Sequence, residues 1–158
     1  MKAKIQHEIQ EYCSLLRLNA IGEHFEEAIK NATDYEGFLH QLLRMEVDAE
    51  EERAKERKIK AAKFPYRKYI EDLEMDLLPE AMRKRLPELC SLEFIRESKN
   101  IIMTGNPGTG KTHTAIGLGI KACEQGYRVL YTTIPYLVTE LKESNSQQKL
   151  RSYQKRFE

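Results

Sequence analysis

The stretch that decides the fold reads NIIMTGNPGTGKTH and occupies residues 100–113. Its first part, Ile101 to Thr104, is short, apolar and β-branched in character, which predicts a buried strand. Residues 105–110 contain three glycines and a proline, which predict a tight turn. Residues 112–125 then carry apolar side chains on one broad face, which predicts a helix. The order of strand, glycine-rich turn and helix indicates an α/β fold.

The turn matches G-x-x-x-x-G-K-[ST], the pattern of a phosphate-binding loop, over residues 105–112. Glycines let successive backbone N–H groups point at an anion, which the loop delivers to a helix N-terminus. Lys111 adds a positive charge for the β and γ phosphates, and the Thr112 hydroxyl is suited to Mg²⁺. The backbone N–H of His113 is expected to approach the α-phosphate, while its imidazole packs or faces solvent. The candidate ATP-binding residues are Gly105, Asn106, Pro107, Gly108, Thr109, Gly110, Lys111, Thr112 and His113, with Thr112 as the Mg²⁺ ligand.

The chain beyond the loop continues the α/β pattern. Gly126 predicts the end of the helix, and Val129 to Thr132 predict a second strand. Strand, helix and strand form a βαβ unit, which implies two parallel strands joined by a right-handed crossover. Residues 135–142 predict one more helix, and residues 143–158 predict a weakly amphipathic one. The predicted fold is therefore a P-loop NTPase with an incomplete parallel sheet.

The part before the loop is expected to be helical. Helices are predicted over residues 3–18, around residues 21–29, and from a capping box at Thr33–Glu36 onward. Residues 50–63 are strongly helical in propensity but carry almost no apolar side chains, and Phe64-Pro65 ends them. Short helices with turns are expected next. The predicted domains are an all-α N-terminal region at 1–64, a connecting segment at 65–97 and part of an ATPase domain at 98–158.

The composition excludes several protein classes. The chain has 158 residues, of which 41% are hydrophobic, and contains no apolar run approaching the roughly 20 residues that span a bilayer. The first residues lack the apolar core of a secretory signal. The three cysteines are far apart and form no CxxC pair, so neither a zinc site nor a disulfide framework is indicated. We therefore expect a cytoplasmic protein without a membrane partner.

Charge is distributed unevenly although the net charge is only +1. Residues 1–52 carry five Lys/Arg against twelve Asp/Glu, whereas residues 53–68 carry eight Lys/Arg against Glu56 alone. Such a compact basic block is typical of proteins that bind an anionic partner. The alternative is a solvated helix face whose cations pair with neighbouring glutamates. Arg83 to Arg85 form a second, smaller basic cluster with the same two interpretations. The candidate DNA contacts are Arg53, Arg57, Lys58, Lys60, Lys63, Arg67 and Lys68.

The residues around the loop resemble a known family. Residues 100–113, followed by GYRVLYTT at 126–133, are similar to the IstB-type helper ATPases of bacterial insertion sequences. The N-terminal half resembles them too, in LLRL at 15–18, FLHQLL at 38–43 and AAKFP at 61–65. These helpers are AAA+ proteins related to the DnaC-type helicase loaders. The resemblance implies an oligomeric protein that binds ATP and Mg²⁺, contacts target DNA and assists a transposase. A helicase loader with the same chemistry is the alternative.

One departure from the family concerns catalysis. A AAA+ domain carries an apolar strand ending in Asp-Glu after the loop, but only 46 residues follow Thr112 and none of them fits. No catalytic residue is identified in this sequence. The expectation is a chain cut inside the ATPase core that binds nucleotide at most, although the family hydrolyses ATP. A non-enzymatic remnant is the third hypothesis.

Overall fold

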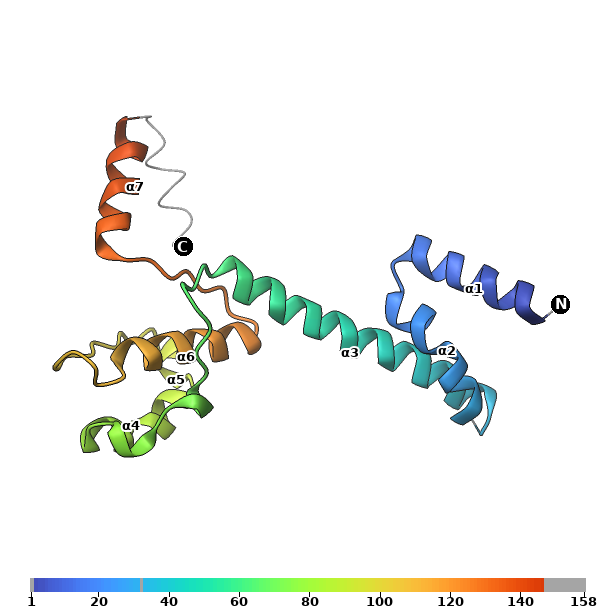
Figure 1. The fold of residues 1–158 in the computed structure, drawn as a ribbon, viewed down its shortest axis with the longest axis horizontal. Coiled ribbons are helices and arrows are strands. Elements are labelled where there is room, and N and C mark those ends of the chain that lie inside the picture. The colour runs from blue at the N-terminus through green and yellow to red at the C-terminus, as the bar shows by residue number, and fades with distance from the viewer. Residues whose placement is uncertain (1, 32, 147–158) are drawn as a thin grey trace. The chain divides into compact units, whose positions relative to one another are not determined.

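The computed structural model describes residues 2–31 and 33–146 and separates into two compact units, residues 1–56 and residues 57–158. Figure 1 shows the order of their helices along the chain. The boundary between the units falls inside the long helix α3 (Tyr35–Ala61). No helix of the described residues combines the length and the apolar character that crossing a membrane requires.

The first unit is built on α1 (Lys2–Leu16) and α2 (Asn19–Asn31), as the apolar spacing predicted. Arg17 takes a left-handed conformation between them, and the N–H of Leu18 donates to the carbonyl of Cys13 at 2.8 Å. The two helices approach closely at Gly22, where an added Cβ would lie only 3.0 Å from Cβ of Cys13. Cys13, Ile21 and Phe25 form the buried core of this unit.

Helix α3 begins in the predicted place but with a different cap. The backbone N–H of Gly37 donates to Oδ1 of Asp34 at 2.7 Å, and the Thr33 hydroxyl also donates to the Asp34 carboxylate. The predicted Thr33–Glu36 capping box is therefore wrong, because the aspartate is one residue nearer to the helix and accepts the hydrogen bond itself. The large apolar side chains in the N-terminal half of α3 differ in exposure. Phe38, Leu42 and Met45 are half-buried, whereas Leu39, Leu43 and Val47 are exposed.

The second unit starts with the end of α3, where Ile59 of the helix and Ala62 just beyond it are buried. The expected short helices follow as the 3₁₀ turns η1 (Ile70–Asp72) and η2 (Met75–Leu77) and the helices α4 (Glu80–Cys90) and α5 (Glu93–Arg96). They bury Leu73, Leu78 and Leu86 in one cluster. The predicted succession of short helices and turns is thus confirmed.

Helix α6 (Lys111–Glu124) is the centre of this unit. It buries Thr114, Ile116, Leu118, Ile120, Ala122 and Cys123. Ile116, Ile120 and Cys123 contact the end of α3, while Leu118 and Ala122 pack with Leu92. The helix ends at Glu124, and Gly126 two residues beyond has a left-handed φ of 93°, as the glycine predicted. Helix α7 (Ile134–Ser146) completes the described part of the chain and includes residues 143–146 of the tail predicted at 143–158, whose remaining residues lie outside it.

The two predicted strands are not confirmed, because the described residues contain no β-strand. Residues 101–104 still show the alternation of a strand with one covered face. Ile101 and Met103 pack against the cluster of Leu92 and Leu118, whereas Ile102 is 86% exposed. In the second segment, the N–H of Tyr131 donates to the carbonyl of Ala62 at 2.8 Å. A strand is defined by pairing with another strand, and these segments pack on helices instead.

Candidate phosphate-binding site

The glycine-rich turn connects residues 101–104 to α6 and depends on left-handed glycines. Gly108 and Gly110 have φ values of 81° and 73°. A Cβ on Gly110 would lie only 2.8 Å from Cδ2 of Leu78, whereas a Cβ on Gly108 would meet nothing within 4 Å. Glycine is therefore favoured at position 110 both by the left-handed backbone and by the lack of space for a Cβ, and at position 108 by the backbone conformation alone.

Lys111 folds back across the turn. Its Nζ lies 3.0 Å from the carbonyl oxygen of Gly105, 2.6 Å from that of Asn106 and 3.2 Å from Oγ1 of Thr109. The Thr109 hydroxyl in turn donates to the carbonyl of Asn106 at 2.9 Å. The ammonium is thereby fixed at the mouth of the loop, next to the first turn of α6.

The N-terminus of α6 has no side-chain cap. Gly110 is the N-cap and offers no acceptor, and the first main-chain bond of the helix runs from Thr114 N–H to Gly110 O at 2.8 Å. The Thr114 hydroxyl donates to the same carbonyl at 3.0 Å. The N–H groups of Lys111, Thr112 and His113 belong to the first turn, where a helix has no internal acceptors. They are suited to an anion, and the macrodipole favours negative charge there.

A cavity of about 340 Å³ lies at this helix end, lined by residues 107–113. Thr112 is exposed within it, so its hydroxyl is accessible to a cation bound beside a phosphate. Mg²⁺ usually keeps several waters and takes oxygen ligands from one or two side chains and from phosphates, which this single hydroxyl fits. All nine residues predicted to bind nucleotide thus lie in one turn and helix start.

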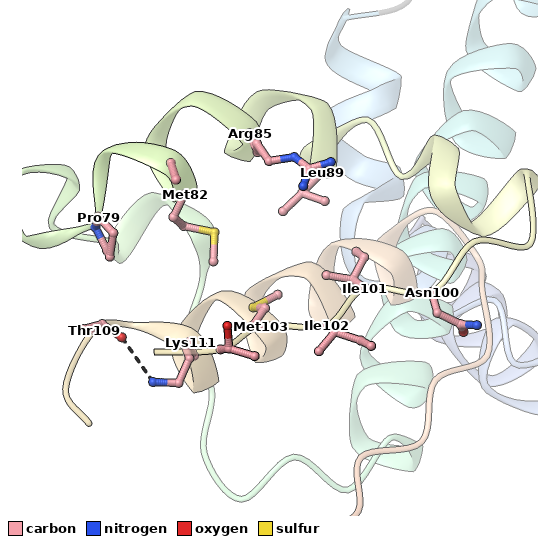
Figure 2. Close-up of a pocket in the computed structure, with 12 residues that line it drawn as sticks. Pro79, Met82, Arg85, Leu89, Asn100, Ile101, Ile102, Met103, Thr109 and Lys111 are labelled. Atoms are coloured by element: carbon pink, nitrogen blue, oxygen red, sulfur yellow. Dashed lines mark hydrogen bonds between the residues drawn. The ribbon is translucent and has the colours of Figure 1, made fainter. Parts of the chain in front are cut away.

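A second cavity of about 400 Å³, drawn in Figure 2, shares Thr109 and Lys111 with the first. It lies between α4, which contributes Met82 and Leu89, and the extended residues 100–104. Thr109 and Lys111 line one end of it. The other polar side chains that line it are Arg85, Asn100 and Thr104. Gly110, Thr112 and His113 of the helix start line the first cavity but not this one, so the first cavity is the one suited to phosphates.

The imidazole of His113 has a role that the sequence did not reveal. Its Nε2 lies 2.7 Å from the carbonyl oxygen of Tyr69, so Nε2 carries the proton and donates. The Tyr69 side chain packs against the core cluster of Ile59, Ala62 and Ile116. Two glycines of α6 let the same segment approach, because a Cβ on Gly117 or Gly119 would lie 2.8 Å from Ile70 or Phe64. In the sequence, two glycines two residues apart inside a predicted helix could have indicated that another segment packs closely there.

The seven candidate DNA contacts do not behave alike. Arg53 donates to Glu46 at 2.6 Å and to Glu50 at 3.1 Å, and the hydrogen bond to Glu46 raises the pKa of its guanidinium. Lys58 donates to the carbonyl of Gly126 at 2.8 Å, at the C-terminal end of α6. These two cations have structural partners within the chain. The remaining candidates are exposed, namely Arg57, Lys60, Lys63, Arg67 and Lys68.

Comparison with known proteins supports the nucleotide-site interpretation. Residues 13–157 match the family described as IstB-like ATP binding protein. The chain is 34% identical over 148 residues to a protein of Pseudomonas aeruginosa named as an ATP-binding protein of insertion sequence IS21. It is 35% identical over 150 residues to a protein of Geobacillus stearothermophilus named as an ATP-binding protein of insertion sequence IS5376. These alignments cover 91% and 92% of this chain but only 56% and 60% of the two relatives.

Proposed function

This chain belongs to the family of IstB-like ATP-binding proteins, and from that membership and the loop geometry we propose that it binds ATP through residues 105–113. The observation that carries the proposal is the position of Lys111. Its ammonium is fixed across the loop mouth by Gly105 and Asn106, beside the uncapped N-terminus of α6. Positive charge and unpaired N–H groups converge where the β and γ phosphates would lie.

Each group of the site has its own role in this proposal. The backbone N–H groups of residues 110–113 would bind the phosphates, and Lys111 would neutralise their charge. The Thr112 hydroxyl would hold Mg²⁺ together with phosphate oxygens, and the cation would neutralise charge on the phosphates. His113 would contribute its backbone N–H, because its imidazole is bound to Tyr69. The apolar residues 101–104 and 129–132 would serve as strands of an AAA+ parallel sheet once further strands pair with them.

We propose that the protein is an ATP-binding accessory protein of DNA transposition. The relatives named above belong to insertion sequences, which favours a transposase partner over a helicase partner. DNA would contact the exposed cations of residues 57–68, where binding through phosphates is independent of base sequence. Several copies of the protein would assemble on target DNA when nucleotide is bound. The chain spans 56% to 60% of these relatives, so ATP hydrolysis is proposed for the family protein as a whole.

A titration with a fluorescent ATP analogue tests the nucleotide proposal. The 158-residue chain is mixed with the analogue in the presence of Mg²⁺, and unlabelled ATP, ADP and adenosine are used as competitors. We expect ATP and ADP to displace the analogue and adenosine to fail, because the loop binds phosphates. Equal competition by adenosine would mean that the base, not the phosphate chain, is bound.

A further inference from the structure

The hydroxyl of Thr109 links the Lys111 ammonium to the backbone of the loop. It accepts a hydrogen bond from Lys111 Nζ and donates one to the carbonyl of Asn106 (Figure 2 draws the first). An ammonium group has three N–H donors. Those of Lys111 meet the carbonyls of Gly105 and Asn106 and the Thr109 hydroxyl, so all three have an acceptor inside the loop.

The three acceptors of Lys111 are not equivalent. The two carbonyl contacts are 3.0 and 2.6 Å long, and the contact with Thr109 is the longest at 3.2 Å. An anionic phosphate oxygen is a stronger acceptor for an ammonium than a neutral hydroxyl. An arriving phosphate oxygen would therefore share the N–H that points at Thr109, while the two carbonyls and the hydroxyl keep the ammonium in place. The Thr109 hydroxyl could still donate to Asn106 and keep the turn closed.

We propose that Thr109 is a positioning residue for the nucleotide that acts through Lys111. Its hydroxyl accepts from the N–H that would also serve the phosphate and would keep this contact in the bound loop, so Lys111 is held in the same direction before and after ATP arrives. This proposal rests on the proposed nucleotide site. It assigns to the side chain a role separate from the backbone N–H that any residue at this position would offer.

Two substitutions separate the hydroxyl from the shape of the side chain. Thr109→Val keeps the branched shape and removes the hydroxyl, whereas Thr109→Ser keeps the hydroxyl and removes a methyl group. Affinity for the fluorescent ATP analogue is measured for the whole chain with Mg²⁺. We expect Thr109→Val to bind about three- to tenfold more weakly than the parent, the value of one hydrogen bond, and Thr109→Ser to remain within about twofold.

A double-mutant cycle with Lys111→Ala tests whether the effect passes through the lysine. Thr109→Val should make no further difference once Lys111 is alanine. An equal loss in both backgrounds, or parent-like affinity of Thr109→Val, would overturn the proposal. Unfolding midpoints in urea should agree among the variants, and if Thr109→Val unfolds early, Thr109→Ala replaces it with the same expectation. A parent chain that does not bind the analogue overturns the nucleotide site itself, whereas tight binding by the valine variant overturns only the role of Thr109.

Discussion

The imidazole Nε2 of His113 lies 2.7 Å from the backbone carbonyl oxygen of Tyr69. This contact joins the first turn of α6 to the segment that precedes η1, across 44 residues of sequence. The same segment contacts α6 at Gly117, where only glycine leaves room for Ile70. The helix that begins at the phosphate-binding loop is therefore held along one side by residues 64–70.

Removing the His113 donor should destabilise the second unit. His113→Leu leaves the partly buried carbonyl of Tyr69 without its partner, which costs about 1–3 kcal/mol in the free energy of unfolding. His113→Gln retains an N–H donor of similar reach and should recover most of this loss. Urea unfolding followed by circular dichroism measures both. Equal stability of the two variants would mean that the hydrogen bond contributes nothing.

Alanine at Gly110 should be costlier than alanine at Gly108. Both positions have a left-handed φ, so alanine at either one is strained by about 1–2 kcal/mol. Only at Gly110 would the new Cβ also collide, at 2.8 Å from Cδ2 of Leu78. The free energy of unfolding of Gly110→Ala should therefore fall further than that of Gly108→Ala by about 1 kcal/mol or more. Identical losses would show that Leu78 moves aside freely.

The helices and the loop were accessible from sequence because each depends on local signals. The start of α6 follows from the glycine–lysine motif, and its end follows from Gly126. The end of α3 follows from Phe64-Pro65, although the helix stops slightly earlier, at Ala61, with Lys63 in a left-handed conformation. The α3 cap was missed because Thr33 and Asp34 are adjacent and both are good caps.

The pairing of the apolar segments and the partners of the basic side chains depend on long-range contacts, which sequence periodicity does not indicate. A strand requires a partner strand, so the apolar runs at 101–104 and 129–132 could be predicted as packing segments, but a formed sheet could not be predicted and their full burial was wrong, since Ile102 is exposed. Likewise, the basic block gave seven equivalent candidates. Arg53 and Lys58 differ from the exposed Lys60, Lys63 and Lys68, because Glu46 accepts from Arg53 and the carbonyl of Gly126 accepts from Lys58.

This difference sharpens the test of the proposed DNA contact. Replacing the exposed Lys60, Lys63 and Lys68 by glutamine should weaken binding to all DNA sequences alike. The slope of log K against log salt should fall by about three, because each lost phosphate contact removes about 0.9. Fluorescence anisotropy with a labelled duplex at several salt concentrations measures this slope.

A charge-matched control uses three exposed lysines elsewhere in the chain, Lys4, Lys30 and Lys142, replaced in the same way. This control should leave the slope nearly unchanged if binding is local to residues 57–68. An equal reduction in both triple variants would indicate attraction by net charge alone and would contradict a defined DNA surface.

The central claim is that Lys111 and the start of α6 form a nucleotide site, and the affinity of Lys111→Ala for the fluorescent ATP analogue tests it most directly. The account predicts at least a tenfold loss of affinity, about 1.4 kcal/mol, while Lys121→Ala on the same helix binds like the parent. Both variants should unfold at the urea concentration of the parent, since among the described residues the hydrogen bonds of Lys111 Nζ go to the largely exposed loop at 105–109. A folded Lys111→Ala variant that binds the analogue as tightly as the parent would contradict the account.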